Sequence, residues 1–169
     1  MSYNLFRRMK QELIDKYNVS VPRYTSYPPA NFFRLFTGEE FLREVDYSNE
    51  VREKNLSFYF HMPFCRRLCH YCGCNSYPMA KEERVEAYVQ ALHKEIDLVA
   101  KHIDKSRRIS QIHYGGGSPT AMPVSVLKEL NEHLLSLFST IEQPEIAIEC
   151  HPGYLTAKDW QGLLDARFN

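Results

Sequence analysis

Four cysteines gather within one stretch of ten residues, and this cluster constrains the chain more than any other feature. Cys65, Cys69 and Cys72 have the spacing C-x3-C-x2-C, and Cys74 follows two positions later. Thiolates are soft anionic ligands, so three of them on one short loop can hold three corners of a cubic iron–sulfur cluster and leave the fourth iron open. A structural zinc site more often uses two separated C-x2-C pairs. Buried cysteines without any metal are the third interpretation.

The composition argues against several classes of partner. The 169 residues carry 21 basic and 21 acidic side chains, so no net charge attracts nucleic acid or an anionic membrane surface. The first residues lack the apolar run of a signal peptide, and no later stretch is long enough to span a bilayer. Without an export signal, an odd total of five cysteines favours reduced thiols and a cytoplasmic protein.

The hydrophobic pattern predicts an α/β chain. Apolar spacing and capping residues predict helices over 3–17, 37–55 and 81–105, from Pro123, and after Thr156. Strand-forming residues occupy 56–60, 109–114 and 145–150. Strands that alternate with helices imply a parallel sheet with right-handed crossovers. In such folds ligands bind at the carboxyl ends of the strands, where the cysteine loop, the three glycines 115–117 and Glu149 are expected.

The chain resembles the radical S-adenosylmethionine enzymes, and among them the oxygen-independent coproporphyrinogen III oxidases of haem biosynthesis. Four stretches carry the resemblance in the order found in that family, namely 23–28, 59–75, 115–120 and 148–149. It therefore covers nearly the whole chain. It implies that residues 56–169 form the first three strand–helix units of a partial parallel (β/α)6 barrel. Residues 1–55 would form a preceding arm of helices and extended chain.

The resemblance also implies a set of ligands. Cys65, Cys69 and Cys72 would bind a [4Fe–4S] cluster, whereas Cys74 belongs to the signature without ligating it. S-adenosylmethionine would be bound by Tyr59, Tyr71, Gly116, Gly117, Ser118 and Glu149. From the residues alone, two interpretations of the glycines stay open: they expose N–H and carbonyl groups to a ligand, or they form a tight strand-to-helix turn. Glu149 is a solvated carboxylate and the tyrosines are packing residues in the corresponding structural interpretation.

Other reactive side chains receive structural interpretations. His61, His113 and His151 are expected to be core or solvated histidines rather than metal ligands. Cys150, at the end of a predicted strand, is expected to be a small buried hydrophobic residue.

The implied reaction is an oxidative decarboxylation. One-electron cleavage of S-adenosylmethionine would lead to hydrogen removal from a propionate of coproporphyrinogen III, and two rounds would give protoporphyrinogen IX. An electron donor such as flavodoxin or ferredoxin would be needed. Family members are much longer, so the resemblance implies a truncated N-terminal part that is inactive alone. A haem-degrading methyltransferase and a haem chaperone are the alternatives within this class, although Cys74 argues against the chaperone. A zinc-binding interaction module is the alternative outside it.

Overall fold

The structure is a computed structural model that describes residues 11–19, 32–50 and 55–169. The chain divides into two compact units, Met1–Thr37 and Gly38–Asn169. Within the first unit residues 11–17 are helical, which confirms the described part of the helix expected over 3–17. The motif at 23–28 lies outside the described residues. Among the residues that are described, no helix combines the length and the apolar character needed to cross a membrane.

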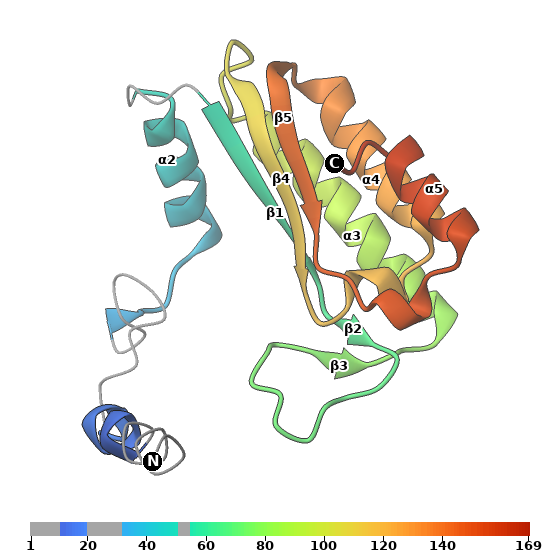
Figure 1. Cartoon of the computed structure of the whole chain (residues 1–169). Helices are drawn as coiled ribbons and strands as arrows, with labels where there is room; N and C mark the ends of the chain where they lie inside the picture. The colour runs from blue at the N-terminus through green and yellow to red at the C-terminus, as the bar shows by residue number, and fades with distance from the viewer. Residues whose placement is uncertain (1–10, 20–31, 51–54) are drawn as a thin grey trace. The chain divides into compact units, whose positions relative to one another are not determined.

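Three parallel strands form the sheet of the second unit (Figure 1). They are β1 (Asn55–Met62), β4 (Arg108–Gly116) and β5 (Thr140–Ile148), in the spatial order β1-β4-β5. The predicted parallel α/β arrangement is therefore confirmed. Strand β5 begins at Thr140 rather than at residue 145 because a shift in register lets both Thr140 and Glu145 pair with β4. The sequence does not predict a strand over 140–144, because Pro144 has no N–H to donate to a neighbouring strand.

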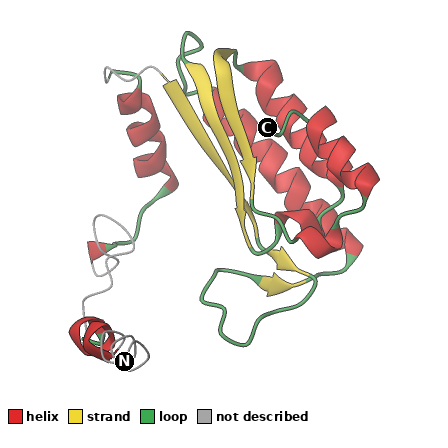
Figure 2. Cartoon of the chain, in the orientation of Figure 1, coloured by secondary structure: helices red, strands yellow, loops and turns green. Residues whose placement is uncertain are grey.

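Helices cover one face of this sheet (Figure 2). They are α3 (Glu82–Ala100), α4 (Val124–Leu137) and α5 (Ala157–Asp165). Helix α2 (Gly38–Ser48) precedes the sheet in the chain. Two short helices, η2 (Pro119–Ala121) and η3 (Pro152–Tyr154), follow the ends of β4 and β5. The predicted cap of the last helix is confirmed, because Thr156 and Asp159 exchange hydrogen bonds as a capping box.

Two helices end earlier than their sequence pattern predicts. Helix α2 stops at Ser48 rather than near residue 55, and α3 stops at Ala100 rather than near residue 105. The residues after the two helices bind each other: the Asn49 side chain donates to the carbonyl of His102 at 2.7 Å and accepts from the N–H of Asp104 at 3.0 Å. These tertiary hydrogen bonds replace further helical turns.

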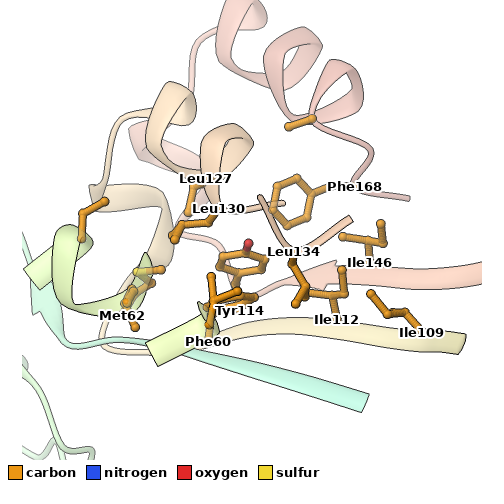
Figure 3. Packing of buried hydrophobic residues seen from close by; sticks show 14 of the residues in the cluster. Phe60, Met62, Ile109, Ile112, Tyr114, Leu127, Leu130, Leu134, Ile146 and Phe168 are labelled. Carbon is orange, nitrogen blue, oxygen red and sulfur yellow. The ribbon is translucent and has the colours of Figure 1, made fainter. Parts of the chain in front are cut away.

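The hydrophobic core lies between the sheet and the three helices (Figure 3). Its fully buried side chains come from all the layers, and include Met62, Ile109, Ile112, Tyr114, Leu127, Leu130, Leu134 and Ile146. One polar link crosses this core. The Tyr114 hydroxyl donates to Asn131 Oδ1 at 2.8 Å, and Asn131 Nδ2 donates to the carbonyl of Ala166 at 2.8 Å. Burial raises the pKa of Tyr114, so the hydroxyl remains a donor and connects β4, α4 and the end of α5.

Replacing Tyr114 by phenylalanine tests this link. Tyr114→Phe is expected to lower the free energy of unfolding by about 1–3 kcal/mol, because Asn131 Oδ1 is left buried without its donor. Equilibrium urea unfolding of the full chain measures the change. The control Tyr47→Phe removes a hydroxyl from a side chain that is 60% exposed. Equal effects of the two substitutions would contradict the proposed role of the buried link.

Candidate functional site

The face of the sheet that points away from the helices carries polar side chains. On β1, Phe60 is buried in the core, whereas Tyr59 is 58% exposed, as the alternation of strand side chains requires. The Tyr59 ring stacks beside His113 of β4, with ring centroids 5.9 Å apart. His113 Nε2 in turn lies 3.6 Å from Glu149 Oε1. The expected orientation of Tyr59, opposite to Phe60, is confirmed.

The cysteine loop is closed at its base by a pair of short parallel strands, β2 (Phe64–Cys65) and β3 (Tyr77–Pro78). The N–H of Tyr77 donates to the carbonyl of Pro63 at 2.7 Å, and the N–H of Met79 donates to the carbonyl of Cys65 at 2.8 Å. The loop 66–76 between them lies beyond the carboxyl ends of β1 and β4 (Figure 1). The sequence did not predict this small sheet, which fixes the start and the end of the loop.

The cysteine thiols differ in their environments. Cys65 is buried, whereas Cys69, Cys72 and Cys74 are exposed. Burial raises the pKa of Cys65, and the nearby Cys72 and Cys69 thiolates raise it further. Hydrogen bonds from the Cys74 backbone and from the Ser76 hydroxyl lower the pKa of Cys72. A bound cationic centre would favour the deprotonated form of Cys65, against the effects of burial and of the neighbouring thiolates.

Two positions of the glycine motif require glycine because of close approach. Gly116 has a φ of +114°, and a Cβ there would lie 2.6 Å from the His61 ring. A Cβ on Gly117 would lie 2.9 Å from the backbone carbonyl of Pro63 and 3.0 Å from the Cys65 sulfur. The glycine motif therefore packs directly against the first residue of the cysteine loop.

The N–H groups of Gly117 and Ser118 are hydrogen-bonded to other residues of the chain. Gly117 donates to the carbonyl of Met62 at 2.8 Å, and Ser118 donates to the carbonyl of Phe64 at 3.1 Å. The sequence predicted that both N–H and carbonyl groups of this turn would be exposed to a ligand. These two N–H groups instead join the motif to the segment that leads into the cysteine loop.

Glu149 stands directly after β5 and beside the glycine motif. Its own N–H donates to the carbonyl of Tyr114 at 2.9 Å, which continues the pairing of the strands by one residue. Its carboxylate accepts from the N–H of Gly116 at 3.3 Å. The pKa of Tyr59 is raised by burial and then by the charge of Glu149. The structure thus brings Tyr59, Gly116 and Glu149 together.

His61 lies within this group of residues, although the sequence interpretation gave it only a core or solvated position. Its Nε2 lies 2.7 Å from the carbonyl of Asn75 in the cysteine loop, and its Nδ1 lies 3.1 Å from the Tyr59 hydroxyl. A carbonyl only accepts, so Nε2 carries the proton and Nδ1 accepts from Tyr59. His61 therefore fastens the loop to β1. Its spacing of two from Tyr59 was the signal that both side chains share one face.

The remaining predicted residues lie at the edge of this group. Tyr71 is 91% exposed on the cysteine loop. Cys150 is exposed, so the expectation of a buried residue was wrong; β5 ends two residues earlier and the helix layer does not cover it. His151 stacks on Tyr154 with centroids 4.0 Å apart, and Arg66 of the loop lies 4.7 Å above that tyrosine ring.

Comparison with known proteins identifies the superfamily to which this chain belongs. The family profile of the Radical SAM superfamily matches residues 59–169. The chain aligns with the solved structure of coproporphyrinogen III oxidase from Escherichia coli, described as a radical SAM enzyme, with a TM-score of 0.78 and 34% identity. That alignment covers 93% of this chain and 34% of the other.

Sequence relatives identify one family within this superfamily. An oxygen-independent coproporphyrinogen III oxidase sequence from Mannheimia haemolytica is 40% identical over 141 residues, covering 83% of this chain and 94% of that relative. The protein of the same name from Synechocystis is 37% identical over 145 residues, covering 85% of this chain and 31% of that relative. The chain therefore belongs to the radical SAM superfamily and, within it, to the oxygen-independent coproporphyrinogen III oxidase family. It spans about a third of the length of most relatives described here.

Membership of this superfamily implies a [4Fe–4S] cluster and S-adenosylmethionine. The donor set fits the cluster, because three thiols stand on one loop and the sulfur of Cys65 faces a glycine rather than a side chain. Within the described residues, no three His, Cys, Asp or Glu side chains converge on a place for one metal ion. That finding concerns single ions, since a cubic cluster distributes its thiolate ligands over separate irons.

Substituting Gly117 tests the packing between the glycine motif and the cysteine loop. Gly117→Ala is expected to reduce iron and sulfide incorporation severalfold, because its Cβ would displace the Pro63 backbone and the Cys65 sulfur. Iron analysis and visible absorption after anaerobic reconstitution measure this. Gly73→Ala is the matched control, because a Cβ on Gly73 meets no atom within 4 Å. Full incorporation by both variants would contradict the proposed packing.

Proposed function

We propose that this chain supplies the cluster-binding and S-adenosylmethionine-binding part of an oxygen-independent coproporphyrinogen III oxidase. The observation that carries the proposal is the contact between the cysteine loop and the glycine motif at Gly117, beside the polar ends of the parallel strands. The names of the relatives supply the reaction. The site supplies the parts that such a reaction needs.

Each proposed ligand has a distinct task. Cys65, Cys69 and Cys72 would hold the cluster, with Cys65 fixed at the base of the loop and the other two on its exposed part. The bound [4Fe–4S] cluster and S-adenosylmethionine together supply one-electron chemistry that removes a hydrogen atom from an unactivated carbon. Three cysteine ligands would leave one iron of a [4Fe–4S] cluster without a thiolate, where S-adenosylmethionine could bind.

The residues around the glycine motif would orient the cofactor. The N–H groups of Gly117 and Ser118 are engaged within the protein, so the motif would present its carbonyl oxygens, which accept from the ammonium group of the methionyl part. Glu149 adds a negative charge that favours the same ammonium group and the sulfonium. Tyr59 and Tyr71 would provide aromatic surfaces for the adenosyl part.

The proposed substrate is coproporphyrinogen III. Each converted propionate loses one hydrogen atom, one carbon dioxide and one electron and becomes a vinyl group, and two conversions give protoporphyrinogen IX. A small electron donor of the flavodoxin or ferredoxin kind would reduce the cluster. The balanced charge of the chain supports an enzyme that uses neither nucleic acid nor a membrane as partner, and the reduced thiols that a cluster needs favour the cytoplasm.

The test uses a protein of the relatives' full length that carries this chain as its N-terminal part. After anaerobic reconstitution, it is incubated with coproporphyrinogen III, S-adenosylmethionine and a reductant. Vinyl-bearing tetrapyrrole with release of carbon dioxide is the expected result. A methylated or ring-opened tetrapyrrole would instead identify a methyltransferase, and bound haem without turnover would identify a chaperone. Either of these results overturns the proposal.

The cysteine ligands make a second prediction. Single substitutions Cys65→Ala, Cys69→Ala and Cys72→Ala are each expected to abolish the brown colour and to reduce bound iron strongly, because each removes one thiolate of three. Cys150→Ala, which changes an exposed thiol outside the loop, is the control and should retain the cluster. Colour and iron content equal to wild type in all three loop variants would overturn the cluster assignment.

Glu149 makes a prediction about the cofactor alone. Glu149→Gln is expected to weaken S-adenosylmethionine binding by about tenfold or more, since loss of one charge–charge hydrogen bond is worth about 1.5–3 kcal/mol. Cluster content should stay unchanged. Equilibrium binding of the cofactor to the reconstituted protein measures the effect. Glu145→Gln is the matched control, because Glu145 lies on the same strand but binds the Gln111 side chain at 3.0 Å. An unchanged affinity in Glu149→Gln would exclude this residue from the cofactor site.

A further inference from the structure

Two histidines face each other between helices α3 and α4, which lie side by side in the helix layer (Figure 1). His93 Nδ1 of α3 lies 2.8 Å from His133 Nδ1 of α4, and the ring centroids are 4.9 Å apart. Two ring nitrogens cannot approach so closely with both lone pairs facing, because their like partial charges repel. A proton or a metal cation must therefore occupy the space between them.

A carboxylate determines which nitrogen of His133 is available. Asp97, one turn after His93 on α3, places Oδ1 2.9 Å from His133 Nε2. A carboxylate accepts hydrogen bonds, so Nε2 of His133 carries a proton and donates it to Asp97. In the neutral imidazole, Nδ1 then has a free lone pair directed at His93. This carboxylate–histidine arrangement is the one that orients imidazole ligands in zinc sites.

We propose that His93 and His133 form a binding site for a divalent transition-metal cation such as Zn²⁺, which would link α3 to α4. Imidazole nitrogens suit zinc, nickel and copper, and Asp97 would fix the tautomer of His133 without binding the metal. No third ligand side chain converges on this place among the described residues, so water molecules would fill the other coordination positions of the metal. On binding, the metal replaces the proton between the two Nδ1 atoms, and His93 takes up the neutral tautomer with its proton on Nε2, so both imidazoles bind as neutral ligands.

The pair needs only a small adjustment to accept the ion. With Zn–N bonds of about 2.0 Å, two tetrahedral ligand nitrogens lie roughly 3.3 Å apart. The side chains must therefore separate by about 0.5 Å from the observed 2.8 Å. His133 is 22% exposed and Asp97 is 56% exposed, so rotation of surface side chains supplies this movement and the ion can enter from solvent. This inference does not depend on the proposed function, because none of the three residues belongs to the cysteine loop or to the strand ends.

Calorimetric titration of Zn²⁺ into the cluster-loaded full chain tests the site. Wild type is expected to show one binding event that His93→Gln and His133→Gln each remove. Asp97→Ala is expected to weaken that event by roughly 10- to 100-fold, because the orienting partner of His133 is lost. His102→Gln is the matched control: His102 Nδ1 pairs with Asp46 Oδ1 at 3.0 Å, and no second imidazole is paired with it in the described chain.

The outcomes separate the proposed site from binding by thiols. Zinc held by Cys74 or Cys150 would appear equally in wild type and in every histidine variant, and a titration showing only that component would overturn the proposal. A measurement on the wild type covers the case in which a variant fails to fold. Zn²⁺ must shift the nitrogen resonances of both Nδ1 atoms, and unchanged resonances would overturn the proposal. If His93 and His133 only share a proton, Zn²⁺ produces neither the binding event nor the shift of the Nδ1 resonances.

Discussion

The site depends on a contact that only glycine permits. At Gly117 the backbone of the motif passes so close to Pro63 and Cys65 that a single added carbon would meet backbone atoms at 2.9 Å. The same close approach lets the N–H groups of the motif bind the segment that leads into the cysteine loop. The position of the buried cysteine is therefore set by β4 as well as by its own loop. A cysteine proposed to bind the cluster and a glycine proposed to bind the cofactor are therefore in direct contact.

The sheet serves two different purposes on its two faces. The face toward the helices is apolar, and its burial supplies most of the stability of this unit. The other face carries Tyr59, His113 and Glu149, whose rings and charges contact one another. Because strand side chains alternate, each strand contributes to the core and to the site at the same time. The stability of the core and the geometry of the site are thus coupled through the same backbone.

The cysteine loop combines a fixed base with an exposed tip. Pairing of β2 with β3 and the hydrogen bond from His61 to Asn75 hold the two ends of the loop. Cys69 and Cys72 lie on the exposed part. Such an arrangement lets the loop wrap a cluster while Cys65 keeps its place against the sheet. His61 belongs to this anchoring although it has no place in the cysteine spacing.

The sequence alone determined the features that depend on short-range pattern. Apolar spacing predicted the helices, strand-forming residues predicted the three strands, and the Thr156 cap followed from a local hydrogen-bonding rule. The cysteine spacing indicated a cluster site by its own chemistry, whereas the glycine triplet and Glu149 were assigned to that site only through the family resemblance. Only the tertiary structure decided where helices α2 and α3 end, since Asn49 binds partners more than fifty residues away. Likewise, the roles of His61 and of the His93–His133 pair, and the exposure of Cys150, depend on which elements pack together. The sequence pattern shows only that Tyr59 and His61 share a face. The contacts of His61 with Asn75 and of His93 with His133 join residues 14 and 40 positions apart, so no local pattern records them.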